Sequence, residues 1–237
     1  MKLLFLLVVL TIITSAKSDY KMAKESSLYY IYREPKVKQD KPPLIVLLHG
    51  LGSNEKDLFS FADELPGNFL VVSARAPYKT GQDSYQWFEV DFSSGKRTIN
   101  GAQAEKSRTT ILEFISQLKQ KHKFDVKQVY LCGFSQGAIM AYSVGLTNPD
   151  KIKGIAVMSG RLLNEVKLLV QKTEKLKGLA VFISHGKNDE MIDISYARES
   201  VAYLKELGIN PTYTEYPEGH TISSAMLSDL IVWLNKN

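Results

Sequence analysis

The chain has 237 residues, of which 44% are apolar and 23% charged, and this is enough for one domain with a substantial core. This composition excludes a disordered or fibrous protein, and no internal repeat or low-complexity tract is present. The net charge is +5, but the basic stretches at 36–41 and 119–123 are short and interleaved with polar residues. Because nucleic-acid binding needs a concentrated basic face, we expect no nucleic-acid partner.

The N-terminus has the layout of a secretory signal peptide. Lys2 precedes an apolar run from Leu3 to Ile13, and small residues follow. The run is shorter than the roughly 18 apolar residues that suggest a membrane span. We therefore predict a signal peptide over residues 1–18, cleaved after about Ala16 or Ser18, and an exported protein, periplasmic or secreted. A retained N-terminal anchor is the alternative.

Residues 19–237 are predicted to form a single domain. Cys132 is the only cysteine, so no intrachain disulfide can form and the domain depends on its core. No stable membrane span is expected once the signal peptide is removed.

The remaining chain alternates strand-like and helix-like segments. Seven runs resemble strands: 27–33, 43–50, 68–74, 128–134, 154–160, 179–186 and 211–217. Helical patterns lie mostly between them, at 55–65, about 102–122, 136–147, 193–208 and 220–235. The central strands are continuous apolar runs, as in a parallel sheet covered on both faces. We predict an α/β fold with a mostly parallel twisted sheet of about seven strands and helices on both faces. Alternation in the first strand favours an antiparallel edge.

Three reactive residues follow strands of this sheet. Ser135 lies in GFSQG (133–137), Asp189 ends HGKND (185–189), and His220 follows the last strand after a short turn. In such sheets ligands bind beyond the carboxyl ends of the strands, so the three side chains can converge there. A serine hydroxyl is a weak nucleophile that needs an adjacent base, and a carboxylate can orient that base. The pattern predicts nucleophilic catalysis without a metal or cofactor.

Each assignment has a structural alternative. Ser135 could be a turn serine, because hydroxyls suit helix N-caps. Among the other histidines, His122 lies in a lysine-rich helix end, which suggests a solvated side chain. His49 and His185 precede glycines at strand ends and are interpreted as shaping backbone turns. His220 is therefore our candidate base.

Four short segments together resemble the α/β-hydrolase superfamily: HGLG (49–52), GFSQG, HGKND and GH (219–220). More narrowly, the chain is similar to the phospholipase/carboxylesterase family, which includes acyl-protein thioesterases. The resemblance covers nearly all of residues 43–237, and WFEV (87–90) is similar to the family's Trp-Phe-Asp segment. The departures are Ala138 after the serine motif, Glu190-Met191-Ile192 after the acid, and Thr221 after the histidine. The predicted signal peptide is a further difference between this chain and the thioesterases of the family, which are cytosolic.

The resemblance assigns the remaining catalytic parts. Asp189 occupies the acid position of the HGxxD pattern, whereas Glu190 is expected to point elsewhere and Asp193 to begin a helix. The backbone N–H of Gln136, directly after the nucleophile, is one expected oxyanion donor. The second is implied to be Leu51, whose side chain would help to line the acyl pocket.

The long segment at 75–100 is expected to contribute to the substrate site, because loops of this length are usually functional or disordered. It carries several aromatic residues, and we predict that Trp87 and Phe88 form an apolar wall near the nucleophile; packing on the core is the alternative.

The sequence hypothesis is a serine carboxylesterase that hydrolyses small to medium acyl esters of small molecules through an acyl-enzyme. A thioesterase or lysophospholipase of the same family is the alternative enzyme, and a feruloyl-type or depolymerase-like esterase stays open because the protein is expected to be exported. From a different class, the chain could be a non-catalytic binding protein on a hydrolase fold.

Overall fold

The computed structural model describes residues 21–23, 26–91, 93 and 97–237. The predicted signal peptide lies outside these residues, so its cleavage stays a prediction. Within the described part of the chain, none of the helices has the length and apolar character needed to cross a membrane.

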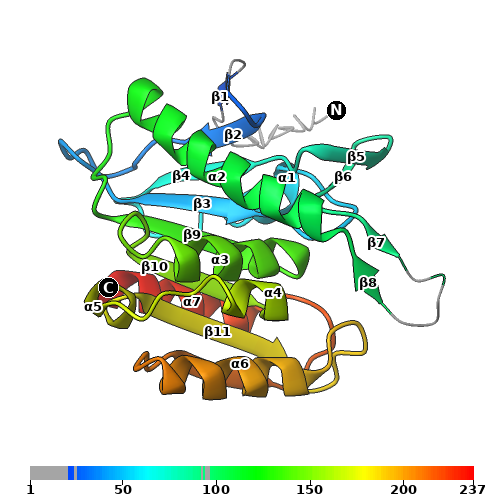
Figure 1. Ribbon diagram of the computed structural model, residues 1–237. Coiled ribbons are helices and arrows are strands. Elements are labelled where there is room, and N and C mark those ends of the chain that lie inside the picture. The colour runs from blue at the N-terminus through cyan, green and yellow to red at the C-terminus, as the bar shows by residue number, and fades with distance from the viewer. Residues whose placement is uncertain (1–20, 24–25, 92, 94–96) are drawn as a thin grey trace, which may run out of the picture.

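The centre of the molecule is an eight-stranded sheet with the order β1-β2-β4-β3-β9-β10-β11-β12 (Figure 1). Its strands are β1 (Lys21–Ala23), β2 (Tyr30–Arg33), β3 (Leu44–Leu48), β4 (Leu70–Ala74), β9 (Val129–Phe134), β10 (Gly154–Met158), β11 (Ala180–Gly186) and β12 (Thr212–Tyr216). The helices are α1 (Lys56–Phe59), α2 (Gly101–Lys121), α3 (Gln136–Thr147), α4 (Asn164–Lys167), α5 (Glu174–Lys177), α6 (Ile194–Glu206) and α7 (Ser224–Lys236). From β4 to β12 neighbouring strands are parallel, while β1 and β2 are antiparallel. The predicted fold class is confirmed, and β1 is an additional edge strand.

Two apolar layers explain why the central strands lack alternation. On β3, Val46 packs in the layer under α2, α3 and α6, whereas Ile45 and Leu47 pack in the layer under α1 and α7. Figure 1 shows these helices on the two opposite faces of the sheet. Each strand residue therefore meets a helix whichever way it points, and both faces need apolar side chains.

Helix starts follow their capping residues. The side chains of Asn100, Asp193 and Ser223 accept hydrogen bonds from the first turns of α2, α6 and α7. The helix expected at 220–235 therefore begins later, at Ser224, and leaves His220 in a loop. The helix expected at 55–65 is only the short α1, after which residues 60–64 continue as turns.

The long segment at 75–100 is ordered by two small antiparallel pairs. One pair joins β5 (Tyr78–Gly81) to β6 (Ser84–Gln86), and the other joins β7 (Val90–Asp91) to β8 (Thr98–Ile99). The segment covers the edge of the sheet where β3 and β9 end (Figure 1).

Candidate active site

The structure brings Ser135, Asp189 and His220 together at the carboxyl edge of the sheet. His220 lies between the other two: its Nε2 is 2.9 Å from Ser135 Oγ and its Nδ1 is 2.7 Å from Asp189 Oδ2. The side chain of Asp189 is fully buried and that of His220 is 18% exposed. This is the geometry of a serine nucleophile, its base and the carboxylate that orients the base.

Ser135 occupies a strained turn between β9 and α3. Its φ is 53° and its ψ is −115°, a backbone conformation that residues with a side chain rarely adopt. Its hydroxyl makes no helix-capping hydrogen bond and instead faces His220. The alternative of a capping serine therefore does not describe this side chain.

The flanking glycines serve close packing and not the turn angle itself. Neither Gly133 nor Gly137 has a positive φ. A Cβ on Gly133 would overlap the backbone of Gly137, and a Cβ on Gly137 would overlap the carbonyl group of Leu48 on β3. The absence of these side chains lets α3 begin directly against the sheet, which raises Ser135 above its edge.

Asp189 is held by hydrogen bonds to both of its carboxylate oxygens. Oδ1 accepts from the N–H groups of Met191 (2.9 Å) and Ile192 (2.8 Å), while Oδ2 faces His220. His185 Nε2 lies 3.2 Å from Oδ2 and 2.7 Å from the Ile192 carbonyl oxygen. His185 thus fixes both the acid and the loop behind it, which is more than the turn role expected from sequence.

The acidic neighbours of Asp189 are placed elsewhere. Glu190 is exposed, and the Asp193 carboxylate accepts from the Ser195 N–H at 2.8 Å as the N-cap of α6. The hydrogen bonds from Ser195 lower the pKa of Asp193.

The two expected oxyanion donors come from the start of α3 and from the loop after β3. Gln136 is the first residue of α3, where a backbone N–H has no acceptor within the helix. Leu51 lies in the loop after β3, and within the described residues its N–H has no acceptor. The next two N–H groups of that loop, of Gly52 and Ser53, donate to the carbonyls of Tyr85 and Gly50.

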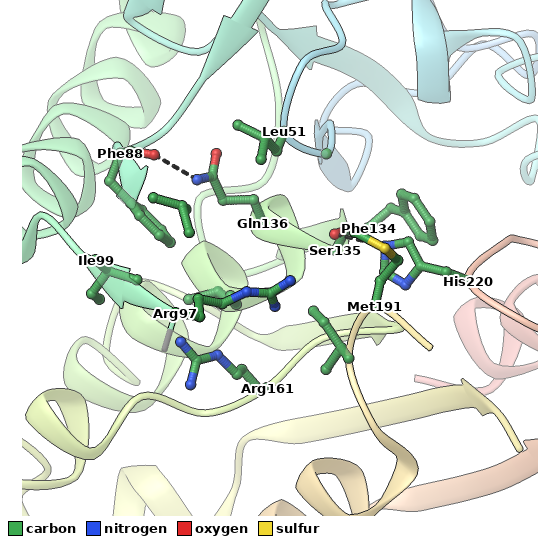
Figure 2. A pocket seen from close by; sticks show the side chains of 14 residues that line it. Leu51, Phe88, Arg97, Ile99, Phe134, Ser135, Gln136, Arg161, Met191 and His220 are labelled. Atoms are coloured by element: carbon green, nitrogen blue, oxygen red, sulfur yellow. Dashed lines mark hydrogen bonds between the residues drawn. The ribbon is translucent and has the colours of Figure 1, made fainter. Parts of the chain in front are cut away.

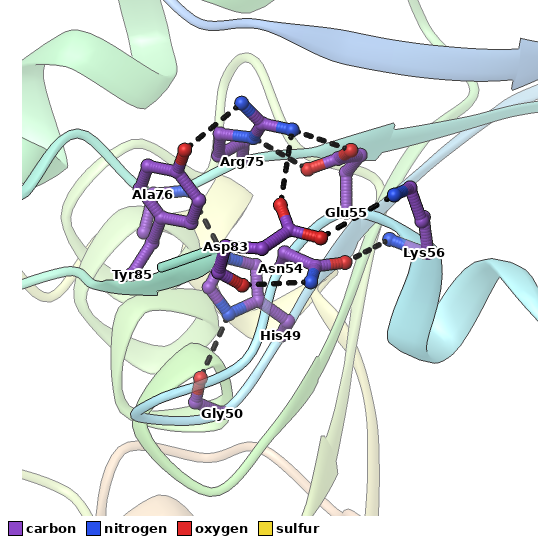
Figure 3. A network of polar contacts seen from close by, with 9 residues as sticks. All are labelled: His49, Gly50, Asn54, Glu55, Lys56, Arg75, Ala76, Asp83 and Tyr85. Carbon is purple, nitrogen blue, oxygen red and sulfur yellow. Dashed lines mark hydrogen bonds and ion pairs between the residues drawn. The ribbon is translucent and has the colours of Figure 1, made fainter. Parts of the chain in front are cut away.

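His49 and Trp87 hold this loop from inside (Figure 3 shows His49). His49 Nδ1 lies 2.7 Å from the Gly50 carbonyl oxygen, and His49 Nε2 accepts from the Ala76 N–H at 3.0 Å. Trp87 Nε1 donates to the His49 carbonyl at 2.9 Å. This bond fixes the segment at 75–100 to the loop, and the Gln136 side chain, which accepts from the Trp87 N–H at 2.7 Å, fixes the same segment to α3.

A buried ion pair supports the same loop from outside (Figure 3). Arg75 donates to both oxygens of Glu55, at 2.6 and 2.8 Å, and the Glu55 side chain is 1% exposed. The guanidinium of Arg75 also lies over the rings of Tyr29 and Tyr85, at 4.2 and 4.5 Å. Such a bidentate pair fixes geometry as well as contributing energy.

Residues 34–237 match the model of the Phospholipase/Carboxylesterase family. The chain belongs to this family. Acyl-protein thioesterase 1 of Mycosarcoma maydis is 26% identical over 220 residues, covering 81% of this chain and 90% of the relative. A probable carboxylesterase SOBER1-like protein of Arabidopsis thaliana is 32% identical over 205 residues, covering 81% and 78%. The crystal structure of a carboxylesterase from Mesorhizobium loti, 20% identical, shares the fold with a TM-score of 0.78 and covers 92% of this chain and 99% of its own.

In this member of the phospholipase/carboxylesterase family, a cavity of about 200 Å³ opens beside the serine (Figure 2). Its wall is mostly apolar and is formed by Gly50, Leu51, Phe88, Val90, Arg97, Ile99, Phe134, Ser135, Gln136, Ile139, Arg161, Met191, Ile192 and His220. Leu51 and Phe88, which the sequence predicts at the substrate site, are among these residues. Trp87 is fully buried and is absent from this wall, because its indole is directed to the loop after β3.

Sequence reasoning missed several side chains of this wall, among them Arg97, Arg161 and Met191. One signal could have found Arg161, since it follows β10 at the same sheet edge as Ser135. Arg97 belongs to the segment at 75–100, whose path depends on contacts far apart in the sequence.

Proposed function

We propose that this family member is a serine carboxylesterase that hydrolyses small to medium acyl esters through an acyl-enzyme. The single observation that carries the proposal is the strained Ser135 with His220 Nε2 at hydrogen-bonding distance from its hydroxyl.

In the proposed reaction, Ser135 Oγ attacks the ester carbonyl while His220 Nε2 accepts the hydroxyl proton. The negative oxygen of the tetrahedral intermediate accepts hydrogen bonds from the N–H groups of Gln136 and Leu51. His220 then gives its proton to the leaving alcohol, and the acyl group stays on Ser135. A water molecule, deprotonated by His220, releases the acid and restores the serine. Asp189 keeps the imidazole in the required tautomer.

The proposed substrate size follows from the cavity. A volume of about 200 Å³ is below the roughly 300–1,000 Å³ of sites for drug-sized ligands. Leu51 and Phe88 provide apolar surface for a short acyl chain. The name of the Mycosarcoma relative favours a second candidate, hydrolysis of acyl thioesters, which the same residues could perform.

The first experiment is labelling with a fluorophosphonate, which reacts with activated serines. We expect a single adduct on Ser135 and, for Ser135→Ala, a loss of about 10⁶ in kcat on a para-nitrophenyl ester. A matched series of esters and thioesters of graded acyl length then separates the two enzymes. Absence of both labelling and turnover by the folded protein would favour a non-catalytic binding protein instead.

We also propose that the protein is exported, with residues 1–18 acting as the leader. The support is the sequence layout of Lys2, an apolar run and small residues. N-terminal sequencing of the protein released by a secreting host should begin near residue 17 or 19. A released chain that begins at Met1 would contradict this, and full retention in membranes would favour an anchor.

A further inference from the structure

Two arginine side chains interrupt the apolar wall beside the nucleophile. Arg97 comes from the segment before β8 and Arg161 from the segment after β10, and both line the same cavity as Ser135. In Figure 2 both lie across the cavity from Leu51 and Gln136, and the guanidinium of Arg97 extends toward its middle. Such a pair of cations has no role in the proposed ester chemistry itself.

Arg161 is only partly satisfied by the protein. It is half-buried, and its Nε is buried without a hydrogen-bond partner. Within the described residues no carboxylate forms an ion pair with it, and its guanidinium lies 5.4 Å from the centre of the Tyr196 ring. Burying a guanidinium donor without an acceptor costs free energy, which a bound anion would recover.

Two acidic residues of this region line a groove next to the cavity. Glu165 and Glu199 line a neighbouring groove together with Arg97 and Arg161. Among the described residues, the wall of the cavity itself contains no aspartate or glutamate. An anion that enters from the nucleophile's side therefore meets two positive charges and no carboxylate in the wall.

We propose that the cavity selects acyl chains that carry an anionic group, a carboxylate or a phosphate, at the end away from the scissile ester. The hydrocarbon part would lie against Phe88, Ile99 and Ile139, and the anion would accept hydrogen bonds from the two arginines. The planar guanidinium fork matches both anions, because it presents parallel N–H donors. The inference rests on the proposed esterase function and names its substrate class.

The test compares two esters that differ only at the far end of the acyl chain. The neutral substrate is para-nitrophenyl hexanoate, and the anionic one is the mono-para-nitrophenyl ester of adipic acid. A third ester, with a terminal phosphonate in place of the carboxylate, decides which anion fits better. The variants are Arg97→Gln, Arg161→Gln, Arg161→Lys and the double glutamine variant. Arg198→Gln is the control, because Arg198 is an exposed arginine of α6 outside the cavity wall.

We expect the wild-type enzyme to have the higher kcat/KM on an anionic ester, and the double variant to lose about 10-fold to 100-fold of that preference. The loss on the neutral ester should be much smaller, Arg161→Lys should keep part of the preference, and added salt should weaken it. A wild-type preference for the neutral ester would overturn the proposal, as would an equal loss on both esters in the arginine variants.

A binding measurement separates this proposal from the function on which it rests. Calorimetry with Ser135→Ala compares monomethyl adipate with methyl hexanoate, and needs no turnover. If no ester were hydrolysed but monomethyl adipate bound more tightly through the arginines, the esterase proposal would fail and the anion site would stand. Equal affinity for the two ligands would contradict the proposed anion site.

Discussion

Asp189 is distinguished from the acidic residues near it by what its oxygens accept. Its buried carboxylate bonds two backbone N–H groups through Oδ1 and the imidazole of His220 through Oδ2. Glu190, next to it in sequence, is exposed. The side chain that can orient the imidazole is therefore fixed by the fold of the 189–192 turn.

Asp189→Asn should keep the fold but lower kcat by about 10⁴, because an amide in place of Oδ2 can hold the imidazole in the wrong tautomer. Glu190→Gln is the matched control and should leave kcat nearly unchanged. Steady-state kinetics on one para-nitrophenyl ester measures both. A severe loss of kcat in Glu190→Gln, with a nearly normal kcat in Asp189→Asn, would assign the role of the acid to Glu190.

Protonation of His49 would disturb the loop that carries Leu51, so we expect the stability of the protein to depend on the pH through this residue. Burial lowers the pKa of His49, although the Gly50 carbonyl acts in the opposite direction. Protonation would place an N–H on Nε2 against the Ala76 N–H that Nε2 now accepts. The neutral form is therefore required, and its contribution to stability is present above the unfolded-state pKa of about 6.5 and is lost as the pH falls below it.

We expect wild type to lose more thermal stability than His49→Gln between about pH 7 and about pH 5, because glutamine stays neutral across the range in which histidine is protonated. The difference between the two Tm-against-pH curves isolates this residue from the rest of the chain, including His122, whose pKa burial also lowers. Parallel curves would show that His49 has no part in acid destabilisation.

At the scale of elements, the contact between β3 and α3 sets the position of Ser135 relative to the sheet. Gly137 lies on the first turn of α3, and a methyl group there would overlap the Leu48 carbonyl. Backbone atoms of a central strand cannot move aside as a flexible side chain can. The helix would have to withdraw from the sheet and carry Ser135 with it.

Gly137→Ala should therefore cost at least about 3 kcal/mol in the free energy of unfolding, at the upper end for overpacking. Gly101→Ala is the matched control, because a Cβ at that first residue of α2 meets nothing within 4 Å. It should be neutral or stabilising by up to about 1 kcal/mol. Urea denaturation measures both, and a tolerated alanine at 137 would show that the helix can shift without loss.

The elements that sequence predicted best are those whose pattern is local and repeated. Seven strands are predicted from strand-like runs, which are continuously apolar in the central strands, and each is present. The eighth strand of the central sheet, β1, has three residues and is defined by its pairing with β2, so little in its own sequence indicates it. Helix α1 is shorter than its pattern because the turns at 60–64 replace its second half.

The candidate site likewise contains residues that the sequence predicts and residues that it does not. Ser135, Asp189 and His220 could be placed together because each follows a strand of one sheet, and the carboxyl ends of parallel strands share an edge. The fully buried position of Trp87 and the meeting of Arg97 with Arg161 depend on how the 75–100 segment folds back on that edge. Such contacts join residues far apart in the chain and leave no periodic signal.

At the scale of the whole molecule, the accessibility of the Cys132 thiol shows whether the central sheet and its covering helices stay folded. It lies on β9, between Leu47 of β3 and Ala156 of β10, and is 1% exposed. Burial raises the pKa of its thiol to about 12, so the reactive thiolate is almost absent from the folded protein at neutral pH. Its side chain packs in the apolar layer under α1 and α7, so these helices must come away from the sheet before a reagent reaches the sulfur.

We therefore expect iodoacetamide to alkylate Cys132 only through global unfolding. Mass spectrometry should show one adduct at most, because the chain has one cysteine. The labelling rate should rise with urea in step with the unfolding equilibrium, and a tight ligand of the cavity should slow it, since binding to the folded state lowers the unfolded population. Fully denatured protein is the control for intrinsic reactivity. Rapid, urea-independent labelling in native buffer would mean that the helix layer over β9, the strand that precedes Ser135, opens locally.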